Sequence, residues 1–137
     1  MSDLLDTSML VRYLTNDPPD RGELSARVID GEDDLLITDV VIAETAYVLT
    51  SVYHMPRQAI VDRIIDVLQK TNIDTFRIEK ALVLDALLRC RPSGRVSFPD
   101  ALIWAAARSA GAPIFSLDER FPSDGVTVLR SARSDSA

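Results

Sequence analysis

The stretch LLITDVVIAE, residues 35–44, joins a short apolar run to the start of a longer one. Leu35-Leu36-Ile37 has the length and composition of a buried strand. Thr38 or Asp39 is suited to cap a helix, which we expect to continue to about Tyr53. A buried strand that leads directly into a helix is the repeating unit of α/β folds.

The same alternation extends outward in both directions along the chain. Further strands are expected at residues 4–5, 73–76, 113–117 and 126–129, and further helices at residues 9–14, 21–29, 56–68, 79–89 and 98–110. This order predicts one α/β domain with a central, mostly parallel sheet of four to five strands, flanked by helices on both faces. We assign the domain to residues 1–130 and expect the polar tail, residues 131–137, to be disordered.

Composition excludes several classes of protein. The chain has 137 residues, one cysteine and one histidine, so a disulfide framework, a cysteine-rich zinc site and a Ser-His-Asp triad all lack their residues. No apolar run is long enough to span a bilayer, and the N-terminus lacks a secretory signal, so we expect a cytoplasmic protein with no membrane contact. The net charge of −6 would repel nucleic acid unless bound metal and a local basic patch attract it.

Four acids are expected at one edge of the sheet. Asp6 and Asp118 end predicted strands, while Asp100 and Glu44 lie in the first or second turn of predicted helices. In a parallel sheet the strands end, and the following helices begin, at the same edge. The sequence therefore predicts that these four carboxylates converge, although they lie far apart along the chain.

Close carboxylates need a counter-charge, because like charges raise each other's pKa and destabilise the site. Mg²⁺ and Mn²⁺ prefer oxygen ligands, and such a metal polarises a phosphoryl oxygen and activates a bound water. The predicted edge is therefore suited to phosphoryl transfer or phosphodiester hydrolysis.

Four segments of the chain resemble the PIN-domain family, and most closely the toxins of VapBC-type toxin–antitoxin pairs. The matching segments are LLDTS (residues 4–8), TDVVIAET (38–45), FPDALIWAAA (98–107) and IFSLDERF (114–121). The resemblance implies a single PIN-like domain with the activity of an endoribonuclease that depends on Mg²⁺ or Mn²⁺. The order and spacing of the four segments carry it, since each motif alone has low specificity.

The resemblance also implies roles for single residues. It implies that Asp6, Glu44, Asp100 and Asp118 are catalytic, and that all except Glu44 bind the metal. Supporting hydroxyls are expected from Thr7, Ser8 and Ser116. At Ser116 the family more often carries threonine, and the hydroxyl is retained.

The expected partners are an RNA substrate, a small antitoxin protein and a second copy of the chain in a homodimer. Four arginines are candidates to contact RNA: Arg12, Arg89, Arg91 and Arg95.

Each acid also has a structural interpretation. Asp6 is a favoured helix cap, Asp100 follows Ser97 at capping-box spacing, and Asp118 suits a turn. Glu44 lies on a largely apolar helix, where an inward carboxylate would be costly unless it were paired or bound to metal.

Two functional alternatives remain beside the ribonuclease. One is a PIN-fold module that binds proteins without catalysis. The other is a different acid–metal phosphodiesterase or phosphatase. A haloacid-dehalogenase-like phosphatase would need a second aspartate two residues after Asp6, where this chain has Ser8. A phosphorelay receiver would need a lysine after a late strand, and this sequence has none there.

Overall fold

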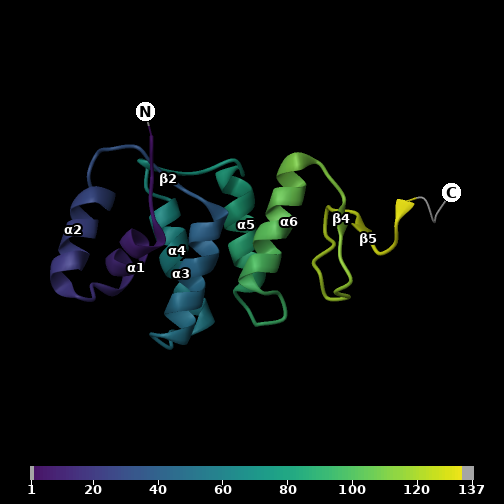
Figure 1. Ribbon diagram of the computed structural model, residues 1–137, viewed down its shortest axis with the longest axis horizontal. Coiled ribbons are helices and arrows are strands. Elements are labelled where there is room, and N and C mark those ends of the chain that lie inside the picture. Colours follow the sequence, from purple (N-terminus) through teal and green to yellow (C-terminus); the bar gives the residue numbers. More distant parts are fainter. Residues whose placement is uncertain (1, 134–137) are drawn as a thin grey trace.

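Helices and short strands alternate along residues 2–133, the part of the chain that the computed structural model describes (Figure 1). The helices are α1 (Thr7–Thr15), α2 (Pro19–Ile29), α3 (Asp39–Ser51), α4 (Arg57–Leu68), α5 (Lys80–Cys90) and α6 (Phe98–Ala110). The strands are β1 (Asp3–Leu4), β2 (Leu35–Ile37), β3 (Ile73–Thr75), β4 (Ile114–Phe115) and β5 (Val128–Leu129). Of the tail predicted to be disordered, residues 134–137 lie outside the described residues.

The five strands are divided between two parallel sheets. Strands β1, β2 and β3 form one sheet in that order, and β4 pairs with β5 in the other. The predicted α/β class and parallel pairing are confirmed. The strands do not form a single central sheet, however, because β4 pairs with β5 and not with the outer edge of β1. Strand signals are local in the sequence, whereas pairing depends on the path of the chain after α6.

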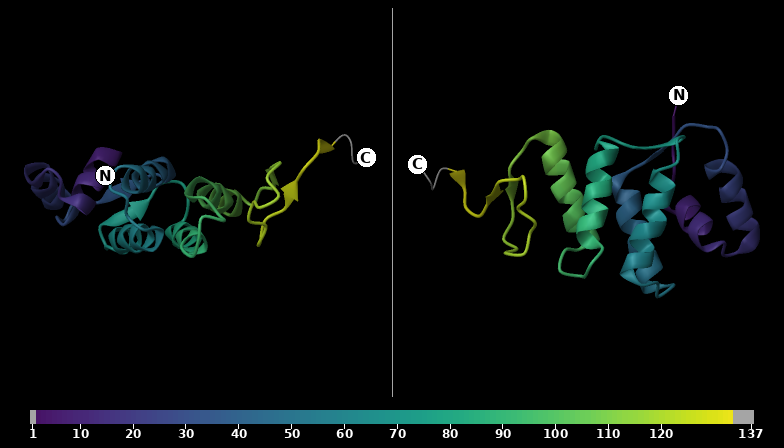
Figure 2. Two further views of the ribbon diagram at one scale, coloured as in Figure 1. Left: turned by 90° about the horizontal axis from the view of Figure 1, so that it is seen from below. Right: turned by 180° about the vertical axis from the view of Figure 1, so that it is seen from behind.

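Helix α6 separates the two sheets. The three views place α5 and α6 between the β1-β2-β3 sheet and the β4–β5 ladder, so the molecule is elongated (Figures 1 and 2). Helix α6 is capped at its N-terminus by Ser97, whose Oγ accepts a hydrogen bond from the Asp100 amide, and at its C-terminus by Gly111, which has a left-handed φ of 62°. Both signals predict these ends from the sequence.

A continuous apolar core joins the helices to the first sheet. Its largest fully buried side chains include Leu10, Ile42, Leu68 and Trp104. Trp104 also fastens the C-terminal segment to α6, since its Nε1 donates a 2.8 Å hydrogen bond to the carbonyl oxygen of Asp124. The first sheet and the helices around it thus form the scaffold that holds the N-terminal acids.

No helix among residues 2–133 has both the length and the hydropathy that crossing a membrane would require.

Candidate active site

Asp6 lies two residues after β1 and caps the N-terminus of α1. Its Oδ2 accepts hydrogen bonds from the Ser8 amide at 3.2 Å and from the Ser8 hydroxyl at 2.6 Å. The hydroxyl bond is the main reason why the pKa of Asp6 lies below its ordinary value of 3.8. Asp6 is therefore an exposed carboxylate, ionised at neutral pH, with a fixed orientation.

Glu44 lies in the second turn of α3 and meets the start of α1. The Thr7 hydroxyl donates a 3.2 Å hydrogen bond to Glu44 Oε1. Glu44 is exposed, so its carboxylate does not bear the cost of burial that an inward position on this apolar helix would impose. The neighbouring Thr45 takes the buried position on α3 instead.

Asp100 lies in the first turn of α6, as predicted, and is half-buried. Its amide donates to Ser97 Oγ at 3.1 Å, which confirms the capping interaction expected from the sequence. Because Asp100 bonds to Ser97 through its backbone amide, its side-chain carboxylate is not used by the cap and can bind another partner.

Asp118 follows β4 in a tight turn. Its Oδ1 accepts a 2.9 Å hydrogen bond from the Arg120 amide, and its own amide donates to Ser116 Oγ at 3.1 Å. The Arg130 guanidinium donates to the carbonyl oxygens of Ser116 and Asp118, at 2.8 and 3.2 Å. The turn interpretation of Asp118 is thus confirmed, and Ser116 orders this turn.

The structure brings Asp6 and Glu44 together through Thr7, but it does not gather all four carboxylates. Within residues 2–133, no three acid, cysteine or histidine side chains lie close enough together to hold a metal ion. Asp118 is separated because β4 does not pair with β1. Carboxylate oxygens are the donors that Mg²⁺ and Mn²⁺ prefer, so the donors fit chemically, while the arrangement seen here is incomplete as a metal site.

The arginines near α6 are mostly engaged within the chain. Arg89 forms ion pairs with Asp85 at 3.2 Å and with Asp124 at 2.8 Å, and it lies 4.2 Å from the Trp104 ring centroid. Arg91 holds both carboxylate oxygens of Asp62, at 2.8 and 2.9 Å. These acids neutralise Arg89 and Arg91, two of the arginines predicted to contact RNA, while the third arginine of this segment, Arg95, is exposed.

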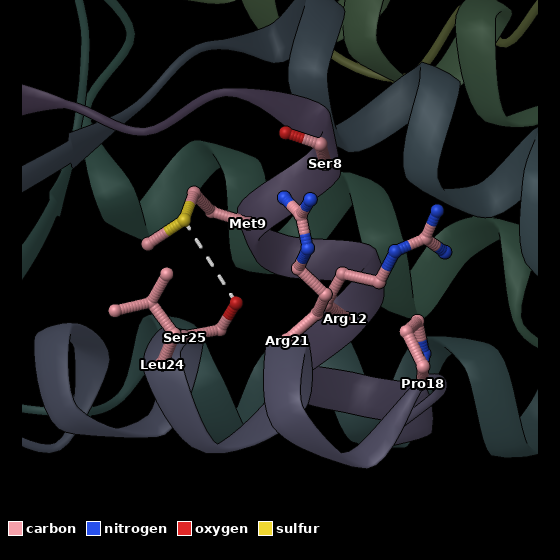
Figure 3. A pocket seen from close by; sticks show the side chains of 7 residues that line it. All are labelled: Ser8, Met9, Arg12, Pro18, Arg21, Leu24 and Ser25. Atoms are coloured by element: carbon pink, nitrogen blue, oxygen red, sulfur yellow. Dashed lines mark hydrogen bonds between the residues drawn. The ribbon is translucent and has the colours of Figure 1, made fainter.

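Arg12 instead lines an open pocket of about 390 Å³ between α1 and α2. Figure 3 shows that the side chains of Arg12 and Arg21 line this pocket together with Ser8, with their guanidinium groups pointing in different directions. Sequence reasoning missed Arg21, because the angle between two helices is not a local property. The signal available was Gly22, a glycine inside a helix pattern, which often marks close packing.

Comparison with known proteins identifies a family. The sequence model of the PIN domain family, described as "PIN domain", matches residues 4–123. This match covers most of the chain and includes all four acids. No curated protein matches the chain.

Proposed function

The chain belongs to the PIN domain family, whose members are typically metal-dependent nucleases, and from this premise we propose that it is an endoribonuclease. The observation that carries the proposal is the junction of Asp6 and Glu44 through Thr7. It unites a strand end and a helix that lie far apart in the sequence, and it leaves two carboxylates exposed at one place.

In this proposal Asp6, Asp100 and Asp118 hold Mg²⁺ or Mn²⁺, and Glu44 completes the catalytic set. The metal, when bound, would polarise a phosphoryl oxygen and lower the pKa of a water. The chain's own residues prepare the site: Ser8 orients Asp6 and lowers its pKa, and Thr7 orients Glu44.

We also propose that the protein acts as a homodimer, in which β4 of one copy pairs with β1 of the other. Asp3 and Leu5 donate backbone hydrogen bonds toward β2, so the peptide groups of Leu4 between them face the outer edge of β1. Ile114 and Ser116 donate backbone hydrogen bonds toward β5. The peptide groups of Phe115, which lies between them, therefore face the outer edge of β4.

Two free edges of the same kind support this pairing. The side chains of Leu4 and Phe115 are 58% and 57% exposed, and an exposed apolar strand edge is a template for pairing with another chain. Reciprocal pairing would bring Asp118 of each copy beside Asp6 of the other and would close the assembly with twofold symmetry. It would thereby bring to Asp6 the Asp118 carboxylate, which the single chain keeps apart from it.

As the resemblance suggests, we propose that the protein is the toxin of a toxin–antitoxin pair. A small antitoxin with a basic segment would suit the acids around Asp6 and the net charge of −6. Loss of RNA cleavage when a co-expressed small protein covers Asp6, with recovery after its removal, would support this role. Binding of that protein with cleavage unchanged would contradict it.

Cleavage of single-stranded RNA tests the ribonuclease directly. Wild type should cleave with Mg²⁺ or Mn²⁺ and stop in EDTA, and Asp6→Asn or Asp100→Asn should lose at least about a hundredfold in rate. Asp33 is also an exposed acid, so Asp33→Asn is the matched control and should cleave RNA at the wild-type rate. A folded protein without cleavage of any RNA would favour a module that only binds proteins.

A mixture of two inactive variants tests the shared site. In the proposed dimer, Asp6→Asn paired with Asp118→Asn leaves one intact site per mixed dimer, so co-expression should restore up to about a quarter of wild-type activity. If β4 instead pairs with β1 of the same chain, the mixture stays inactive. That result would contradict the proposed pairing of strands between the two copies.

A further inference from the structure

The pocket between α1 and α2 holds two arginines that no acid among residues 2–133 neutralises. Arg12 is half-buried and Arg21 is exposed, and both line the pocket (Figure 3). Neither guanidinium makes an ion pair or a side-chain hydrogen bond to another residue of the range 2–133. Two like charges that share a concave surface repel each other unless an anion lies between them.

Close packing of the helices places these arginines together. Gly22 follows Arg21 on the buried side of α2, where a Cβ atom would come within 2.7 Å of the Asn16 Cα. Only glycine allows this approach, because the contact is with backbone that cannot move aside. The fold therefore fixes the backbone positions of Arg12 and Arg21 relative to each other.

Arg57, Arg89 and Arg91 differ in this respect. Arg89 and Arg91 are bound to Asp85, Asp124 and Asp62. Arg57 donates to the carbonyl oxygens of Cys90 and Val96. An anion that reached those guanidinium groups would have to displace partners that they already hold, whereas Arg12 and Arg21 have their donors free.

The pocket adjoins the candidate active site through one residue. Ser8 lines the pocket, and its hydroxyl is bonded to Asp6 Oδ2 at 2.6 Å. Met9, Pro18 and Leu24 add an apolar wall beside the two guanidinium groups. The pocket thus combines two guanidinium groups, which are donors that suit phosphate oxygens, with an apolar surface.

We propose that Arg12 and Arg21 bind a backbone phosphate of single-stranded RNA, next to the phosphate that is cleaved at Asp6. The proposal rests on the ribonuclease function and adds the surface that holds the strand. A fork of guanidinium donors matches phosphate oxygens, and Leu24, 47% exposed, would contact the neighbouring nucleoside. The pocket would thereby offset the unfavourable net charge of the protein at the one place where RNA must approach.

Binding without cleavage isolates this contact. Fluorescence anisotropy with a short labelled single-stranded RNA, in EDTA, would compare wild type with Arg12→Ala, Arg21→Ala and the double variant. Each single change should weaken binding about tenfold, since a hydrogen bond to a charged group is lost. The double variant should also lower the slope of log affinity against log salt by about 0.7, the value for one phosphate in single strands.

Arg27→Ala is the matched control, because Arg27 is exposed on the same helix but outside the pocket. Arg12→Lys keeps the charge without the fork and should lose less affinity than Arg12→Ala. The proposal would be overturned if the Arg12 and Arg21 variants bound RNA with the same affinity as Arg27→Ala. Thermal unfolding at the wild-type temperature would show that these variants remain folded. Equal competition by polyglutamate would overturn it in favour of an acidic protein partner.

The two proposals fail in different ways. If RNA binding depends on both arginines but no RNA is cleaved with metal, the ribonuclease function is wrong and the phosphate site stands. If wild type cleaves RNA and the arginine variants bind and cleave equally well, the phosphate site is wrong and the function stands.

Discussion

Thr7 Oγ1 donates a 3.2 Å hydrogen bond to Oε1 of Glu44, 37 residues away in the sequence. Thr7 directly follows Asp6, so this bond sets the position of Glu44 relative to the Asp6 carboxylate. A hydroxyl that orients a catalytic carboxylate acts through geometry, since it contributes no charge of its own.

Thr7→Val should therefore lower kcat for RNA cleavage about tenfold with little change in KM, because a hydrogen bond to a charged group is lost. Thr15→Val, on the same helix, removes a hydroxyl that bonds only to the Val11 carbonyl oxygen, and it serves as the control. Steady-state kinetics with one RNA would measure both. Equal kcat values for the two variants would remove Thr7 from the site.

Ser8→Ala should raise the pKa of Asp6 toward 3.8, because the hydroxyl that donates to Asp6 Oδ2 is lost. A depressed carboxyl pKa contributes stability that is present above the ordinary value and is lost as the pH falls through the folded-state pKa. The stability difference between wild type and Ser8→Ala should thus shrink in acid below pH 3.8. Titration of the Asp6 carboxyl carbon by NMR measures the pKa, and an unchanged value in Ser8→Ala would contradict the assigned cause.

Gly22→Ala should destabilise the fold by roughly 1–3 kcal/mol, despite the better helix propensity of alanine. The added methyl group would meet Asn16 and force α1 and α2 apart. Gly94→Ala is the control, since its nearest contact would lie at an ordinary 3.6 Å. Urea unfolding compares the two, and equal stability would mean that the helices are not closely packed there.

Thr45→Val should raise the free energy of unfolding by about 1 kcal/mol, since it removes a buried hydroxyl without a partner. Thr45 is fully buried, and its Oγ1 has no hydrogen-bond partner among the described residues. Thr50→Val, on the same helix, removes an exposed hydroxyl that bonds to the Ala46 carbonyl oxygen and should change stability by less than about 0.5 kcal/mol. Thermal unfolding that shows Thr45→Val to be less stable than wild type would mean that this hydroxyl has a partner.

Local signals in the sequence predict much of this fold. The cap at Ser97 and the glycine at Gly111 give the limits of α6, and the short apolar run at residues 35–37 gives β2. Asp100 lies in a first helical turn, as expected, whereas Asp6 follows β1 by two residues and Asp118 follows β4 by three, because both strands are shorter than predicted. Each of these features depends on residues only a few positions apart.

Features that depend on distant contacts were not predictable. Three such features follow from the path of the chain in space. They are the pairing of β4 with β5 alone, the exposure of Glu44, and the ion pairs of Arg89 and Arg91. Arg21 was missed for the same reason, because its role depends on how α2 crosses α1. Periodicity identifies elements, but it does not state which edges or faces meet.

The central claim is that Asp6, Asp100 and Asp118 hold one divalent metal ion. Calorimetric titration with Mn²⁺ tests it most directly, with Asp33→Asn as the control variant. Wild type and Asp33→Asn should bind Mn²⁺ saturably, and Asp6→Asn, Asp100→Asn and Asp118→Asn should each lose at least about tenfold in affinity. Binding that is unchanged by Asp6→Asn and Asp118→Asn, in variants that remain folded, would contradict the claim.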